Sequence, residues 1–212
     1  MQLPGRGSRL TEACFVQIGP AADQAADAIA QLGEPNVMLF GHSMGALLAY
    51  EVTRRLEERY ALIPQCLLVS GYKSPTTMRT GHKYHLCDDT EFIAKIRELG
   101  ATPDAILNDP EAMEFLLPAF RSDFAIAENY PFGPVKQHLR TEIIAFAGDQ
   151  DSEASLDQVA AWRETTTAPF EMRAFAGGHF FIHDNEPEFL AALSQEIKKK
   201  AVAFGLRGEE RP

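Results

Sequence analysis

A chain of 212 residues, 45% of them hydrophobic and 24% charged, has the composition of one ordinary globular domain and is slightly short for two. Its net charge of −10 argues against nucleic acids and anionic membranes as main partners. Three scattered cysteines indicate no disulfide framework, and no membrane-spanning stretch or signal peptide stands out, so we expect a soluble cytoplasmic protein.

The predicted elements alternate between helix and strand. After a turn-rich opening, MQLPGRGSRL, apolar residues spaced by three and four predict a helix over 21–32. A second helix is expected from about 44 to 59, and short apolar runs predict strands at 36–40, 65–70, 141–146 and 170–175. Such strands, separated by helical or irregular sequence, are typical of a parallel sheet, so we expect an α/β fold.

The segment between the second and third strands has a different character. Residues 88–130 indicate three helices with no strand among them. A helical insertion between strands of an α/β sheet often covers an active site, so we assign a lid to about 76–130. Ordinary packing helices are the alternative, and periodicity does not separate the two. The whole chain, 1–212, fits a single domain with a flexible tail at about 204–212.

The stretch LFGHSMGALLAYE at 39–51 places a serine between two glycines, where a predicted strand meets a predicted helix. A serine hydroxyl becomes a useful nucleophile when a base takes its proton and backbone N–H groups await the oxyanion. A Gly-x-Ser-x-Gly turn between strand and helix exposes the hydroxyl at the helix N-terminus. We therefore predict that Ser43 is a nucleophile; a glycine-lined turn with a capping serine is the alternative.

The base and the acid are expected later in the chain, because hydrolases with this turn run in the order serine, acid, histidine. His179, in FAGGHFFI just past the fourth strand, lies on a glycine turn that would expose it, and it is the predicted base. Asp151 follows the third strand in FAGDQD and is the predicted acid. Asp149 is the alternative acid, and its other possible role is to cap the turn.

Several histidines also raise the question of a metal. His183 follows His179 in an H-x-x-x-H spacing, but no third ligand is evident nearby. His82, His85 and Cys87 in GHKYHLC look superficially like ligands, and we favour a polar surface loop. The sequence therefore predicts neither a metal nor a bound cofactor.

Five segments together carry a family resemblance: QLPGRGSRL, FGHSMGALLAYE, the helical stretch EFIAKIRELGATPDAILNDPE with LLPAFRSDFAIAENY, FAGDQD and GGHFF. They resemble the type II thioesterases that accompany polyketide and non-ribosomal peptide synthetases. The serine turn alone indicates a hydrolase, whereas the LPGRG segment and the lid sequence narrow the resemblance to this family.

The resemblance implies an α/β-hydrolase fold with a mostly parallel sheet, and hydrolysis of acyl or peptidyl thioesters on the phosphopantetheine arms of carrier proteins. Ser43 would be the nucleophile, His179 the base and Asp151 the orienting carboxylate, with the backbone N–H of Met44 as one oxyanion donor. Apolar lid positions are expected to line a channel for the acyl chain, with plain packing as the alternative: Phe92, Ile96, Leu116, Leu117 and Phe120.

One departure from the family pattern concerns the N-terminus. Family members carry a strand and a His-Ala-Gly-Gly type loop, which supplies the second oxyanion donor, before the LPGRG segment. Nothing in this sequence resembles them, so we expect the N-terminal strands to be missing and turnover to be reduced. Two further readings stay open: a generic serine carboxylesterase of the same fold, and a truncated, non-catalytic form that binds carrier proteins.

Overall fold

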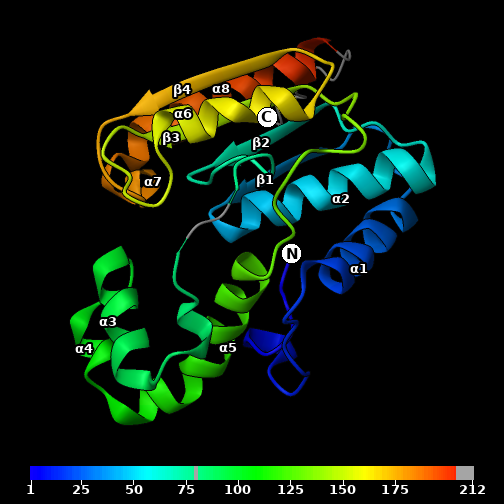
Figure 1. Cartoon of the computed structure of the whole chain (residues 1–212). Coiled ribbons are helices and arrows are strands. Elements are labelled where there is room, and N and C mark those ends of the chain that lie inside the picture. The colour runs from blue at the N-terminus through cyan, green and yellow to red at the C-terminus, as the bar shows by residue number, and fades with distance from the viewer. Residues whose placement is uncertain (79–80, 204–212) are drawn as a thin grey trace, which may run out of the picture.

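The computed structural model describes residues 1–78 and 81–203, so the predicted tail at 204–212 lies outside the described residues. Within these described residues, four strands pair side by side and in parallel, in the order β1-β2-β3-β4 (Figure 1). The predicted α/β class with a parallel sheet is confirmed. The strands are β1 (Met38–His42), β2 (Cys66–Ser70), β3 (Ile143–Gly148) and β4 (Phe170–Phe175).

The helices fall before, between and after the strands, as the alternating pattern predicts. The α-helices are α1 (Ile18–Gln31), α2 (Met44–Tyr60), α3 (Asp89–Leu99), α4 (Asp104–Leu107), α5 (Pro110–Glu128), α6 (Leu156–Ala160), α7 (Phe181–Asp184) and α8 (Glu186–Ala203). The part of the chain that the structure describes also has three short 3₁₀ turns, η1 (Gly7–Arg9), η2 (Tyr84–Leu86) and η3 (Ala161–Thr165). The predicted strands are all present, displaced by at most two residues, and the two predicted N-terminal helices are α1 and α2.

The sheet separates two apolar cores, because successive side chains of a strand point to opposite faces. Leu67 and Val69 of β2 pack on one face with α1, α2 and η3. Leu68 packs on the other face with Phe181 of α7 and Phe189 of α8. Strands β2 and β3 are buried along their whole length, which explains why both stand out in the sequence as continuous apolar runs. Among the described residues, β1 and β4 form the edges of the sheet.

Helices α3, α4 and α5 stand apart from the sheet, at the lower left of Figure 1, and we call them the lid helices. The three predicted helices of 88–130 are therefore confirmed. Asp88 and Asp109 begin α3 and α5 by accepting hydrogen bonds from backbone N–H groups of the first turn. The lid helices have a small apolar core of their own, formed by Phe92, Ile96, Leu107 and Met113.

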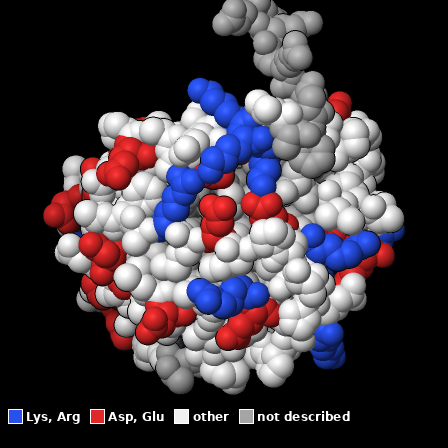
Figure 2. Space-filling view, turned by 90° about the horizontal axis from the view of Figure 1, so that it is seen from above, with Lys and Arg blue, Asp and Glu red and all other residues white. Residues whose placement is uncertain are grey.

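Charges of both signs are mixed on the face shown in Figure 2. Two lysines near the end of α8 form ion pairs: Lys199 lies 2.9 Å from Glu196, and Lys200 lies 2.5 Å from Glu142. The first pair links neighbouring turns of α8, and the second ties its C-terminal end to the residue that precedes β3. None of the described helices combines the length and the apolar character needed to cross a membrane.

Candidate active site

Ser43 lies in a strained turn between β1 and α2. Its φ of 54° falls in the left-handed region that residues other than glycine rarely adopt. The turn holds this conformation because the Ser43 N–H donates to the carbonyl of Ser70, at 2.8 Å, and because the chain closes tightly around it. A Cβ on Gly41 would lie 2.0 Å from the carbonyl oxygen of Gly45, so only glycine fits at that position. The strain projects the hydroxyl out of the sheet.

His179 lies in the loop that follows β4, next to the loop that follows β3. The two loops approach so closely that a Cβ on Gly148 would lie 2.4 Å from the carbonyl oxygen of Gly178. Asp149 fixes the same contact, because its Oδ1 accepts a hydrogen bond of 2.9 Å from the N–H of Gly177. Asp149, the alternative acid of the sequence analysis, therefore stabilises the loop that carries His179, because its Oδ1 accepts from the backbone of that loop.

The three predicted catalytic side chains lie together. His179 Nε2 is 2.9 Å from Ser43 Oγ, and His179 Nδ1 is 3.0 Å from Asp151 Oδ2. The Asp151 and His179 side chains are only 1% and 6% exposed. A carboxylate can only accept, so Nδ1 carries the proton, and the Nε2 lone pair is free to accept the Ser43 proton.

The backbone holds the acid in place. Asp151 Oδ1 accepts hydrogen bonds from the N–H groups of Glu153, at 2.8 Å, and Ala154, at 3.3 Å, which leaves Oδ2 for His179. Met44, the predicted oxyanion donor, is the first residue of α2, where N–H groups have no acceptor within the helix. Its position directly after Ser43 puts one free donor and the positive end of a helix dipole beside the nucleophile.

A cavity of about 610 Å³ opens onto these groups. Ser43, Met44 and His179 line it from the sheet side. The lid helices and the segment that leads into them line the other side, with Tyr84, Lys95, Leu99, Asp123, Phe124, Ala127 and Glu128 among the contributors. The cavity therefore lies between the sheet and the lid helices, where an insertion that covers the site is expected.

The five predicted channel residues are not among those that line this cavity, and this placement corrects the expectation. Phe92 and Ile96 are buried in the lid core, Leu117 and Phe120 pack against that core, and Leu116 is half-buried outside it. The physical reason is that the lid helices bury these apolar side chains against one another, which removes them from water without a ligand. Lid side chains from other positions, Leu99 and Phe124, face the cavity instead.

Lys95 is a contributor that sequence reasoning missed. Its amino group lies 2.7 Å from Glu153 and 3.1 Å from Glu98, and the side chain is 8% exposed. Glu153 belongs to the loop that holds Asp151, so this ion pair joins α3 to the acid loop. The sequence shows only a lysine within a predicted helix, and that does not identify a partner 58 residues away.

His42, the residue before the nucleophile, was also missed as part of the site. Its Nδ1 lies 3.0 Å from Ser70 Oγ, and its ring centroid lies 5.2 Å from that of His179. Its Nε2 is buried and has no hydrogen-bond partner among the described residues. Burial of the ring, together with the nearby His179, lowers the pKa of His42 to about 3, so this imidazole is neutral at physiological pH.

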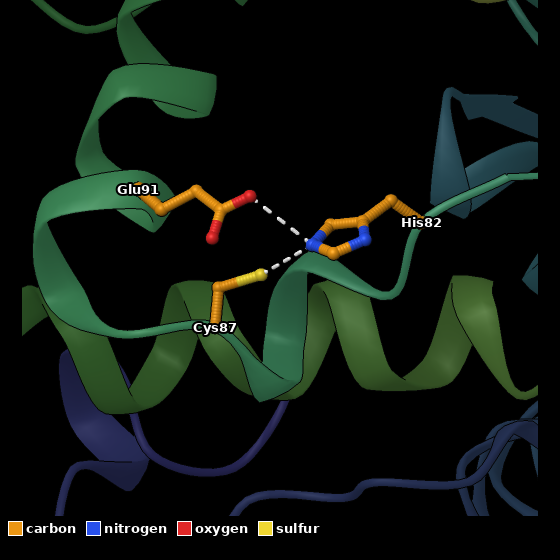
Figure 3. Close-up of side chains that lie close together, drawn as sticks. All are labelled: His82, Cys87 and Glu91. Carbon is orange, nitrogen blue, oxygen red and sulfur yellow. Dashed lines mark hydrogen bonds and ion pairs between the residues drawn. The ribbon is translucent and has the colours of Figure 1, made fainter.

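The remaining histidines of the sequence analysis divide into separate environments. His183 stacks on Phe180, with ring centroids 6.0 Å apart. His85 binds Glu128, whereas His82 lies next to Cys87 and Glu91 (Figure 3). His82, Cys87 and Glu91 are the one group of three potential metal ligands among the described residues.

A parallel sheet with a strained serine after one strand, and a histidine and a carboxylate after later strands, defines an α/β hydrolase. Comparison with known proteins narrows this class. The family model for the Thioesterase domain matches residues 1–197. The chain belongs to the thioesterase family and is a hydrolase that acts on thioesters.

Several of the similar proteins are named for biosynthetic pathways. The chain is 37% identical to thioesterase PikA5 of Streptomyces venezuelae, over 93% of this chain and 70% of the relative. It is 35% identical to a probable cadicidin biosynthesis thioesterase of Streptomyces griseus, over 93% of this chain and 53% of the relative, so it spans about half of that protein. Among solved structures, the type II thioesterase BorB of the borrelidin cluster is 36% identical with a TM-score of 0.82, covering 92% of this chain and 78% of BorB.

Proposed function

We propose that this protein hydrolyses acyl or peptidyl thioesters from the phosphopantetheine arms of carrier proteins, as an editing or release step in polyketide or non-ribosomal peptide biosynthesis. The observation that carries the proposal is His179, which is within hydrogen-bond distance of Ser43 through one ring nitrogen and of Asp151 through the other. The similarity to PikA5 and to the type II thioesterase BorB supports the class of substrate.

In the proposed mechanism, Ser43 Oγ attacks the thioester carbonyl while its proton passes to His179 Nε2. The oxyanion that forms accepts a hydrogen bond from the Met44 N–H. The carbon–sulfur bond then breaks, and His179 gives the proton to the departing thiolate, which leaves as a thiol. A water molecule, deprotonated by His179, attacks the acyl-enzyme, and the carboxylic acid leaves as Ser43 regains its proton. Asp151 stays ionised throughout and stabilises the imidazolium.

The partner in this proposal is an acyl or peptidyl carrier protein domain, whose flexible arm would deliver the thioester into the cavity between sheet and lid helices. A cavity of about 610 Å³ falls within the range of small-molecule sites. The mechanism requires no metal and no bound cofactor. A cytoplasmic location follows from the cysteine content and remains a prediction.

A fluorophosphonate probe tests the nucleophile. We expect the probe to modify Ser43, and the Ser43→Ala variant to show neither labelling nor thioester hydrolysis above background. Ser152→Ala is a matched control, because Ser152 also lines the cavity and is exposed. Unchanged labelling of Ser43→Ala would contradict the assignment, and no labelling of the parent protein would favour the non-catalytic form.

The substrate class needs a second measurement. Values of kcat/KM for an acyl-carrier thioester and for a simple soluble ester of the same acyl group should favour the carrier substrate. Equal or higher values for the soluble ester would support the carboxylesterase reading instead.

A further inference from the structure

Three side chains with metal-binding atoms converge at the start of the lid helices (Figure 3). His82 Nε2 lies 2.8 Å from Cys87 Sγ and 3.1 Å from Glu91 Oε1. The three ligand atoms all lie within 4.8 Å of one another. His82 also lines the catalytic cavity, and its side chain is 56% exposed, so the group lies at the cavity rim.

The donor set of this group is chemically specific. One imidazole nitrogen, one thiolate and one carboxylate oxygen are the ligand types that bind zinc, and a water can complete a tetrahedron. Zinc–ligand bonds of about 2.0–2.3 Å would place the donor atoms about 3.3–3.6 Å apart. The observed separations of 2.8 and 3.1 Å are slightly shorter. Entry of an ion therefore needs only a small outward rotation of the exposed His82 and Glu91 side chains.

The backbone that carries Cys87 and Glu91 is already held in place. The buried carboxylate of Glu128 accepts hydrogen bonds from the N–H groups of Tyr84, at 3.0 Å, and His85, at 3.1 Å, which fixes η2 just before Cys87. Asp88 caps α3 by accepting from the Glu91 N–H at 2.9 Å. Two of the three ligands thus stand on an ordered scaffold, which lowers the entropy lost when an ion binds.

We propose that His82, Cys87 and Glu91 form a binding site for a zinc-class divalent ion at the rim of the cavity. The ion would join the rim residue His82 to the first turn of α3. This site is separate from the Ser43, His179 and Asp151 group, and the proposal does not depend on thioester hydrolysis. This proposal replaces the expectation of a polar surface loop, because the sequence analysis did not place Glu91 next to His82 and Cys87.

Binding of zinc to this site should release a proton, which can be measured. The pKa of the Cys87 thiol is raised by burial and by its hydrogen bond to Glu91, and the carboxylates of Glu128 and Asp88 add to the effect, so the free thiol keeps its proton. Zinc binds the thiolate, so each bound ion releases that proton to solvent. Zinc affinity should therefore rise with pH.

The test uses the full chain with Zn²⁺ in calorimetry and Co²⁺ in absorption spectroscopy. We expect one equivalent of Zn²⁺ to bind with release of a proton, and Co²⁺ to give a thiolate-to-metal charge-transfer band. Cys87→Ala should abolish the band and weaken Zn²⁺ binding by more than about a hundredfold, since loss of even an outer-shell partner costs about 10–100-fold. Cys14→Ala is the matched control, because Cys14 is the other half-buried free cysteine, and it should change neither.

Two further variants separate this site from the catalytic histidine. Glu91→Gln, which leaves the thiol in place, should weaken Zn²⁺ binding, whereas His179→Ala should leave it unchanged. Zinc binding that persists in Cys87→Ala, or that disappears in His179→Ala, would overturn the proposal. So would a Co²⁺ spectrum without a thiolate band.

Discussion

Replacing Asp151 with asparagine tests how the hydrogen bonds around His179 set its tautomer. The asparagine oxygen would remain with the N–H groups of Glu153 and Ala154, because these donors already bind Oδ1. The amide NH₂ would then take the place of Oδ2 and donate to His179 Nδ1. The imidazole would be forced to carry its proton on Nε2, where it can no longer accept the proton of Ser43.

The expected loss is about 10⁴-fold in turnover, the size seen when a catalytic histidine is held in the wrong tautomer. Each factor of ten corresponds to about 1.36 kcal/mol, so the transition state would be destabilised by about 5 kcal/mol. Turnover of an acyl-pantetheine thioester would be measured beside an unfolding curve, which establishes that the variant is folded.

Asp149→Asn is the matched control for this prediction. The asparagine oxygen can still accept from the N–H of Gly177, so the histidine loop keeps its brace, and we expect a loss of less than about tenfold. If Asp149→Asn proved the damaging change while Asp151→Asn kept near-normal turnover, the assignment of the acid and the tautomer argument would both be refuted.

Two other predictions concern the lid and His42. Phe92→Ala should lower the free energy of unfolding by about 3–5 kcal/mol and leave acyl-chain preference unchanged, because Phe92 is buried in the lid core. Leu99→Ala, at the cavity wall, should shift the preference between acyl chains by about 0.8 kcal/mol for each acyl-chain methylene by which they differ. The opposite pattern would indicate that Phe92 lines the acyl-chain channel. The pKa of His42 is about 3 in the folded protein, against 6.5 for an unperturbed histidine. Between these two pH values the unfolded chain therefore binds a proton at His42 that the folded protein does not bind. Stability should therefore fall by up to about 1.4 kcal/mol per pH unit below 6.5 through this group, and not above it. Urea unfolding of the parent and His42→Gln between pH 4 and about 7 checks this, and equal slopes would contradict it.

The strands and the Ser43 turn could be predicted because local sequence determines them. The turn needs small residues at fixed offsets, and β2 and β3 are apolar throughout because both of their faces are buried. Chain order was then sufficient to place Asp151 and His179 at the same edge of the sheet as Ser43, since the carboxyl ends of parallel strands lie together.

The contacts of the lid helices could not be predicted in the same way. Periodicity indicates which face of a helix is apolar, and it does not indicate what covers that face. Phe92 and Ile96 were expected in a channel, although the other lid helices cover them. The Lys95–Glu153 pair and the meeting of His82 with Glu91 depend on tertiary placement, and no local pattern encodes either contact.

The neutral state of His42 has a consequence for the proposed chemistry. During turnover His179 must become an imidazolium, and it lies beside both the Asp151 carboxylate and the His42 ring, whose centroid is 5.2 Å away. A charged His42 at that distance would oppose protonation of His179, whereas a neutral ring leaves the carboxylate as the dominant charge. Burial beside Ser70 keeps His42 neutral at physiological pH. His42, the residue next to the nucleophile, therefore lies beside the base without competing with it for the proton of Ser43.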